Sequence, residues 1–147
     1  ARFMIKIETE TIIPASPEQI WDILTDFESY PEWNPMILEV TGKPVIGAKL
    51  KLKVSAPDNS GRKYSFKAVI VNNQPSEMLA WKGGVPGILS GFHYWKLSSC
   101  HSGTRLIHGE DFFGLYAWFM GRERIMSLKP AYENMNVAMN ERVSTLN

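Results

Sequence analysis

Two polar side chains share one face of a predicted strand with two large apolar ones in "GTRLIHGEDFFG", residues 103–114. Side chains alternate between the two faces of a strand, so Leu106, His108, Glu110 and Phe112 point to the same side. A histidine, which titrates near neutral pH, and a carboxylate are groups that bind a ligand hydroxyl or transfer a proton. His108 and Glu110 are therefore the first candidates for chemistry.

A third candidate, His93, lies in the preceding predicted strand, "ILSGFHYWKL". A tight turn within "SCHSG" pairs His93 with Glu110 and Trp95 with His108. Directly opposed side chains lie about 5 Å apart at Cβ, which is within hydrogen-bonding reach for these residues. A register slip of one residue would reverse the faces and turn Asp111 inward instead.

The pair of His93 and Glu110 leaves several hypotheses open. It can be a buried structural pair that satisfies itself, or it can orient the polar group of a ligand. Together with His108 it can also act as general acid and base, which makes these three the candidate catalytic residues. The same atom types bind metals, but their spacing is not diagnostic of a metal site. We therefore predict neither a metal nor a cofactor.

The segments around these residues predict an α+β fold. "FMIKIETETIIP" alternates and is rich in β-branched residues, so we expect a strand at about 3–13. Ser16, Pro17 and Gln19 then favour the start of a helix at about 17–26, followed by a short helix near 28–33. Turn-forming residues separate six further strands, expected at about 37–42, 47–56, 63–73, 77–83, 88–98 and 103–114.

The last part of the chain, 117–145, has helical periodicity. Apolar side chains recur there at steps of three and four residues, at Leu128, Tyr132, Met135, Met139 and Val143. Pro130 removes a backbone donor, so we expect a break near Lys129 and the better helix after it.

Short connections between successive strands imply an antiparallel sheet, and seven strands twisted around one long helix leave a space between them. Core packing is the competing role for the aromatic and methionine side chains that face this space. The residues expected to contact a ligand there are Trp33, Phe66, Trp81, His93, Trp95, His108, Glu110, Phe112, Tyr132, Met135 and Met139.

Length and composition are typical of one globular domain, residues 1–147. The net charge of +1, without a basic stripe, argues against nucleic acid as a partner. No apolar run reaches the roughly twenty residues of a membrane span, so we expect no stable membrane insertion. The single cysteine, Cys100, fits a reducing, cytoplasmic location. We expect a monomer or a weak homodimer.

The segment "IPASPEQIWDILTDFESYPEWNP" resembles the N-terminal signature of the START-like (SRPBCC) superfamily, which includes the polyketide cyclase/dehydrase and lipid-transport family. "GFHYWKL", "GTRLIHGEDFFG" and "MNVAMNERV" resemble its later strands and its last helix, so the resemblance covers nearly the whole chain. It implies the helix-grip fold, a seven-stranded antiparallel sheet wrapped around a long C-terminal helix with a deep cavity between them. Pro130 departs from the smooth terminal helix that is usual in this family.

Members of this superfamily bind lipids, sterols, polyketides and plant hormones, and some are cyclases or aromatases. We therefore expect a small hydrophobic ligand with a polar group, bound for transport or sensing and oriented by His93, His108 and Glu110. One alternative is a cyclase-, aromatase- or dehydratase-type enzyme that uses the His/Glu pair as acid and base. A second alternative is a protein-interaction module in which the cavity has collapsed.

Overall fold

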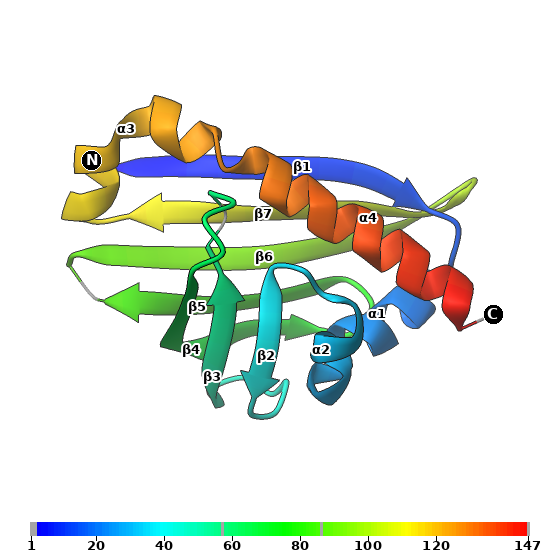
Figure 1. The fold of residues 1–147 in the computed structure, drawn as a ribbon. Helices are drawn as coiled ribbons and strands as arrows, with labels where there is room; N and C mark the ends of the chain where they lie inside the picture. Colours follow the sequence, from blue (N-terminus) through cyan, green and yellow to red (C-terminus); the bar gives the residue numbers. More distant parts are fainter. Residues whose placement is uncertain (1–2, 57, 86, 147) are drawn as a thin grey trace.

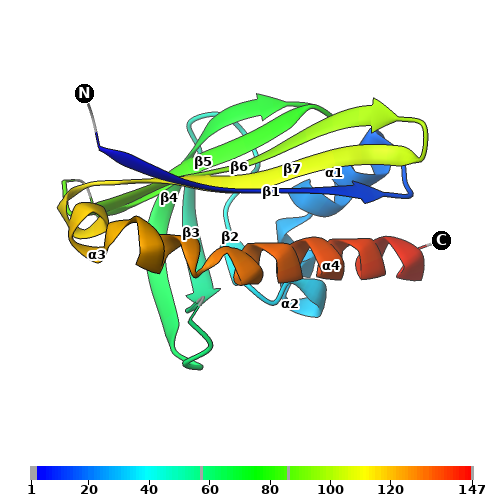
Figure 2. The ribbon, with the colours of Figure 1, turned by 90° about the horizontal axis from the view of Figure 1, so that it is seen from above.

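The computed structural model describes residues 3–56, 58–85 and 87–146. A seven-stranded antiparallel sheet, in the order β1-β7-β6-β5-β4-β3-β2, curves around the C-terminal helix (Figure 1, Figure 2). The strands are β1 (Met4–Ile13), β2 (Ile37–Thr41), β3 (Lys49–Ser55), β4 (Lys63–Gln74), β5 (Met78–Val85), β6 (Leu89–Cys100) and β7 (Gly103–Phe113). The helices are α1 (Pro17–Thr25), the 3-10 helix η1 (Phe27–Ser29), α2 (Tyr30–Trp33), α3 (Leu115–Met126) and α4 (Lys129–Thr145). The predicted helix-grip fold is confirmed.

Strand β1 explains why one face of the sheet is covered. Exposed and buried side chains alternate along it, and Ile5, Ile7 and Ile13 are fully buried on the inner face. Thr9 takes an inward position in the same alternation and is also buried. The covered face is therefore apolar, with a polar group inserted in the middle of β1.

Helix α1 begins where the sequence predicts. The Gln19 N–H donates to Ser16 Oγ at 3.2 Å, and the Ser16 N–H donates to Gln19 Oε1 at 2.9 Å. These reciprocal bonds satisfy backbone donors that the first helical turn leaves free. Ile20, Ile23 and Leu24 are buried on one face, so α1 closes the end of the sheet where α4 terminates (Figure 1).

The hairpin of β6 and β7 has the predicted register. His93 lies opposite Glu110, and Trp95 lies opposite His108. His93, Trp95 and His108 are all buried, so the polar candidates do point to the covered face.

The C-terminal region consists of two helices, and the predicted break is confirmed. Helix α3 ends at Met126 and α4 begins at Lys129, with Pro130 in the first turn of α4. Backbone N–H groups of a first turn have no partner within the helix, so proline fits there. A second interruption, which the helical periodicity does not predict, is Gly121 inside α3 with a φ of 83°.

Only the first turn of α4 reaches the open space beneath the sheet. Tyr132 borders that space, whereas Met135, Met139 and Val143 pack in the core. None of the helices in the described ranges is long and apolar enough to cross a membrane.

Candidate functional site

A cavity of about 670 Å³ lies between the sheet, α3 and the start of α4. Its volume is within the roughly 300–1,000 Å³ that is typical of small-molecule sites. Exposed side chains such as Tyr64 and Tyr116 border its mouth, whereas Trp81, His93 and Tyr132 belong to its buried end. The walls are mainly apolar, with contributions from Leu52, Phe66, Trp81, Phe112, Met120 and Ile125.

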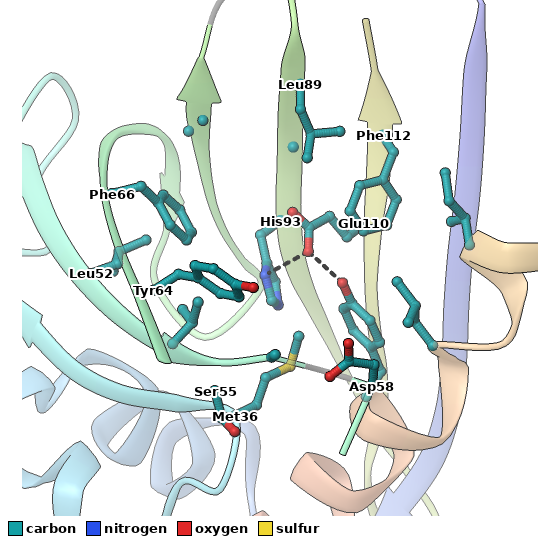
Figure 3. Close-up of a pocket in the computed structure, with 18 of the residues that line it drawn as sticks. Met36, Leu52, Ser55, Asp58, Tyr64, Phe66, Leu89, His93, Glu110 and Phe112 are labelled. Atoms are coloured by element: carbon teal, nitrogen blue, oxygen red, sulfur yellow. Dashed lines mark hydrogen bonds and ion pairs between the residues drawn. The ribbon is translucent and has the colours of Figure 1, made fainter. Parts of the chain in front are cut away.

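The buried end of the cavity carries a carboxylate, Glu110, that two neighbours hold in place (Figure 3). The Tyr132 hydroxyl donates to Glu110 Oε1 at 2.6 Å, and His93 Nδ1 lies 3.3 Å from the same oxygen. Burial, together with the charge of Glu110, raises the pKa of Tyr132 well above its usual value, so the hydroxyl stays protonated and donates. Both neighbours therefore engage a single carboxylate oxygen.

The other oxygen, Glu110 Oε2, has no hydrogen-bond partner among the residues that the structure describes. It lies over Gly91 of β6, where an added Cβ would overlap with it. Gly91 thus provides the room that the carboxylate occupies. The Glu110 side chain is 15% exposed and lines the cavity, so water or a ligand donor in the cavity can reach this oxygen.

Behind His93, hydrogen bonds continue through the core to β1. His93 Nε2 lies 2.7 Å from His108 Nε2, and His108 Nδ1 lies 3.0 Å from Asn136 Oδ1. Asn136 Nδ2 in turn donates to Thr9 Oγ1 at 2.8 Å. The Thr9 hydroxyl donates to the His108 backbone carbonyl at 2.7 Å, which closes the network.

The last of these bonds determines the direction of the others. Because the Thr9 proton goes to a carbonyl, Thr9 Oγ1 accepts from the Asn136 amide, and Asn136 Oδ1 faces His108 as an acceptor. His108 Nδ1 therefore carries a proton. Burial and the neighbouring His93 lower the pKa of His108 well below its usual value, so the ring is neutral and Nε2 is an acceptor. His93 must then donate its Nε2–H to His108.

The contact of 3.3 Å between His93 Nδ1 and Glu110 Oε1 is attractive only with a proton on one of the two groups. A bare Nδ1 facing a carboxylate would place two acceptors against each other. A proton on Nδ1 gives an imidazolium–carboxylate pair, and a proton on the carboxyl group gives a neutral pair. With a proton in either place, the pair would be a proton donor at the polar end of the cavity.

The side chains of Glu110, His93 and His108 lie in a row and do not surround a common point. His93 stands between the other two and uses one ring nitrogen for Glu110 and the other for His108. Within the described part of the chain, no group of three His, Cys, Asp or Glu residues is arranged to hold a metal ion.

The predicted contact residues divide into a wall group and a supporting group. The wall group consists of Phe66, Trp81, His93, Glu110, Phe112 and Tyr132. Trp95, His108, Met135 and Met139 are at most 1% exposed and lie behind the wall. Trp95 shows why, since its ring stacks on His93 and on His108 with centroid distances of 4.4 and 5.2 Å. Ligand contact stays a prediction for the wall group, whereas the supporting group holds it in place.

Trp33 also lies away from the cavity wall. It ends α2 and packs edge-on against Tyr30, with the ring centroids 5.4 Å apart. Asn34 Oδ1 accepts from the backbone N–H groups of Met36 and Ile37 at 2.9 and 2.8 Å. The "YPEWNP" segment is thus a closed turn, and Met36 rather than Trp33 reaches the cavity.

Asn136, Thr9 and Gly91 take part in the site but were not predicted. Asn136 follows Tyr132 by four residues, so it lies on the same face of α4. Thr9 is a polar residue at an inward position of an alternating strand. Both signals are present in the sequence, whereas the room that Gly91 provides depends on the side-chain conformation of Glu110.

Comparison with known proteins identifies the family and the fold. The chain matches the family model "Polyketide cyclase / dehydrase and lipid transport" over residues 4–143. A search of curated proteins finds no match. A structure from Rhodobacter sphaeroides is 18% identical, with a TM-score of 0.76 over 97% of this chain and 94% of that chain.

Two further structures carry descriptive names. Ara h 8.0201 is 15% identical, with a TM-score of 0.74 over 97% of this chain and 99% of that chain. The di-domain ARO/CYC StfQ, from the steffimycin biosynthetic pathway, is 15% identical with a TM-score of 0.67, over 95% of this chain and 49% of StfQ. At these identities the likeness is one of fold alone. Because the family model matches nearly the whole chain, the protein belongs to the polyketide cyclase/dehydrase and lipid-transport family.

Proposed function

We propose that this protein binds a small, largely apolar molecule in the cavity and orients the polar group of that molecule on Glu110. The observation that carries this proposal is the unpaired Glu110 Oε2 at the buried end of an apolar cavity. The apolar walls would supply affinity of about 25 cal/mol per Å² removed from water. Glu110 Oε2 would select a ligand with a hydroxyl or amine donor.

The proposed role is that of a carrier or sensor for a lipid-, sterol- or polyketide-like molecule. The family description, which includes lipid transport, supports a role of this kind. A cavity of about 670 Å³ argues against the interaction module with a collapsed interior. The cytoplasmic location and the monomeric or weakly dimeric state stay predictions.

A matched pair of probes tests whether a polar group is recognised. Naphthalene and 2-naphthol have the same fused rings and differ only by one hydroxyl donor. We expect 2-naphthol to bind about tenfold more tightly or better, because hydrogen bonds to charged groups contribute about 1.5–3 kcal/mol. Calorimetry and thermal shift would measure both probes.

Substitutions test whether Glu110 causes the preference for 2-naphthol over naphthalene. Glu110→Leu removes the acceptor, and Gly91→Ala displaces it, so both should bind the two probes almost equally. Ser90→Ala, next to Gly91 but outside the cavity wall, is the control and should keep the preference. Equal binding of the probes to the unaltered protein, or a preference that survives in Glu110→Leu, would contradict the proposal.

A second candidate function is acid–base catalysis in the same cavity, with a cyclase-, aromatase- or dehydratase-type reaction. The observation that favours it is the 3.3 Å contact between His93 Nδ1 and Glu110 Oε1, beside a carboxylate oxygen that has no hydrogen-bond partner among the described residues. A positioned acid–base group accelerates proton transfer by roughly 10²–10⁴-fold. Hydrogen–deuterium exchange at the α-carbon of α-tetralone, followed by NMR, should then be faster than in buffer and slow again in Glu110→Gln. Equal rates for both proteins would exclude this role for Glu110.

A further inference from the structure

Helix α3 exposes large apolar side chains in its first half. Leu115, Trp118 and Phe119 are 69%, 62% and 72% exposed. Their spacing of three and four residues places them on one side of the helix. Most of the other aromatic residues are buried or half-buried, so this outward face differs from the rest of the molecule.

The inward side of the same helix is apolar too. Ala117 is fully buried, and Met120 lines the cavity. Tyr116 lies between the two sides of the helix, since it is 50% exposed and also borders the cavity mouth. Packing of the inward side therefore does not need the outward residues, and their exposure calls for a separate explanation.

The turn between β5 and β6 extends the exposed surface. Ile88 is 57% exposed, and its backbone carbonyl accepts from the Tyr116 N–H at 2.8 Å. Figure 1 and Figure 2 show α3 and this turn at the same end of the molecule. We call the surface formed by Ile88, Leu115, Tyr116, Trp118 and Phe119 the apolar tip.

The charged residues that follow the apolar tip along the chain are mainly basic. The segment from Phe112 to Gly121 contains no charged residue, and Arg122 and Arg124 follow with Glu123 between them. An anionic surface that approached the tip would meet basic side chains close to its apolar contacts. Tryptophan and tyrosine are also enriched where a bilayer meets water, because their rings are apolar and their N–H and O–H groups are polar.

We propose that the apolar tip docks this protein on the surface of an anionic lipid bilayer. The tip would enter the interface without crossing the membrane, while Arg122 contacts lipid phosphates. Because Tyr116 belongs both to the tip and to the cavity mouth, docking would turn the cavity towards the lipid. Exchange of an apolar ligand with the bilayer rests on the proposed function, whereas docking itself does not.

Cosedimentation with vesicles tests the docking. The vesicles contain phosphatidylcholine alone or phosphatidylcholine mixed with phosphatidylglycerol. We expect binding to the mixed vesicles and at least about a tenfold loss in the double variant Trp118→Ser, Phe119→Ser, since membrane affinity scales with the apolar area inserted. Arg122→Gln should lower the preference for the anionic vesicles by about fivefold. The matched control is Val45→Ser with Ile46→Ser, which removes residues 54% and 67% exposed on the β2–β3 connection; it should bind as the unaltered protein does.

Three results would overturn the docking: no binding to either vesicle type, binding that survives the Trp118 and Phe119 substitutions, or equal losses in the control. Sedimentation velocity tests a different occupant of the tip. A dimer that is present in the unaltered protein and absent in the double variant would mean that the tip binds a second copy of the chain. Binding of 2-naphthol should be unchanged in the double variant, since neither residue lies on the cavity wall. Failure of naphthol binding with intact vesicle binding would reject the cavity function and leave the docking in place.

Discussion

At the scale of residues, burial explains how the polar end of the cavity is organised. His108 is fully buried between His93 and Asn136, where a charged imidazole would lose its hydration. His108 therefore accepts a hydrogen bond from the His93 Nε2–H and stays neutral. The direction of the hydrogen bond between His93 and His108 thus depends on Asn136 and Thr9, which do not line the cavity.

The first prediction concerns pH. The pKa of His108 lies well below 6.5 in the folded protein, owing mainly to burial, so only the unfolded chain takes up this proton. The free energy of unfolding should therefore fall as the pH drops below about 6.5, by at most about 1.4 kcal/mol per pH unit from this group. NMR of the imidazole nitrogens should show His108 neutral, with the proton on Nδ1, from about pH 7 to about pH 5. A His108 signal that titrates near pH 6.5 would contradict the assignment of the hydrogen bonds.

The second prediction concerns Asn136. Asn136→Leu removes the acceptor of the His108 Nδ1–H and the donor to Thr9, which leaves buried polar groups without partners. We expect the free energy of unfolding in urea to decrease by about 1–3 kcal/mol. Asn140→Leu, at an exposed position of the same helix, is the control and should change it by less than about 0.5 kcal/mol. Equal effects of both substitutions would mean that the network contributes nothing specific.

At the scale of elements, the sequence predicts type and order well, because each element carries its own local signal. Ser16 and Gln19 mark the start of α1, and Pro130 marks the break between α3 and α4. The distance of a side chain from the cavity is harder to predict. Trp95 shares a strand face with His93, yet it is covered by stacked rings, because alternation identifies a face and not its distance from the cavity. The break at Gly121 is equally invisible to periodicity.

The third prediction tests one of these local signals. Ser16→Ala removes the side-chain oxygen that accepts from the Gln19 N–H at the start of α1. The expected loss in the free energy of unfolding is about 1 kcal/mol, as for other helix caps. Ser98→Ala is a suitable control, because the Ser98 side chain is exposed and has no hydrogen bond to any residue that the structure describes. If both variants unfold at the same urea concentration, the capping box does not stabilise α1 in this protein.

At the scale of the whole molecule, the sheet curves around two successive helices, and the space that it encloses contains both the core and the cavity. Helix α4 fills one part of the inner space with Met135, Met139 and Val143, while the cavity remains between the sheet, α3 and the start of α4. The sequence predicts a space of this kind from the order of elements. It does not predict the space's extent, because that depends on where α3 turns away at Gly114 and Gly121.

The most direct test of the central claim is a crystal structure of the protein with 2-naphthol. We predict that the fused rings lie in the cavity against Trp81 and Phe112, with the naphthol oxygen within hydrogen-bonding distance of Glu110 Oε2. Naphthol bound elsewhere, or bound in the cavity with its hydroxyl towards the mouth, would contradict the proposal that Glu110 orients the polar group of the ligand.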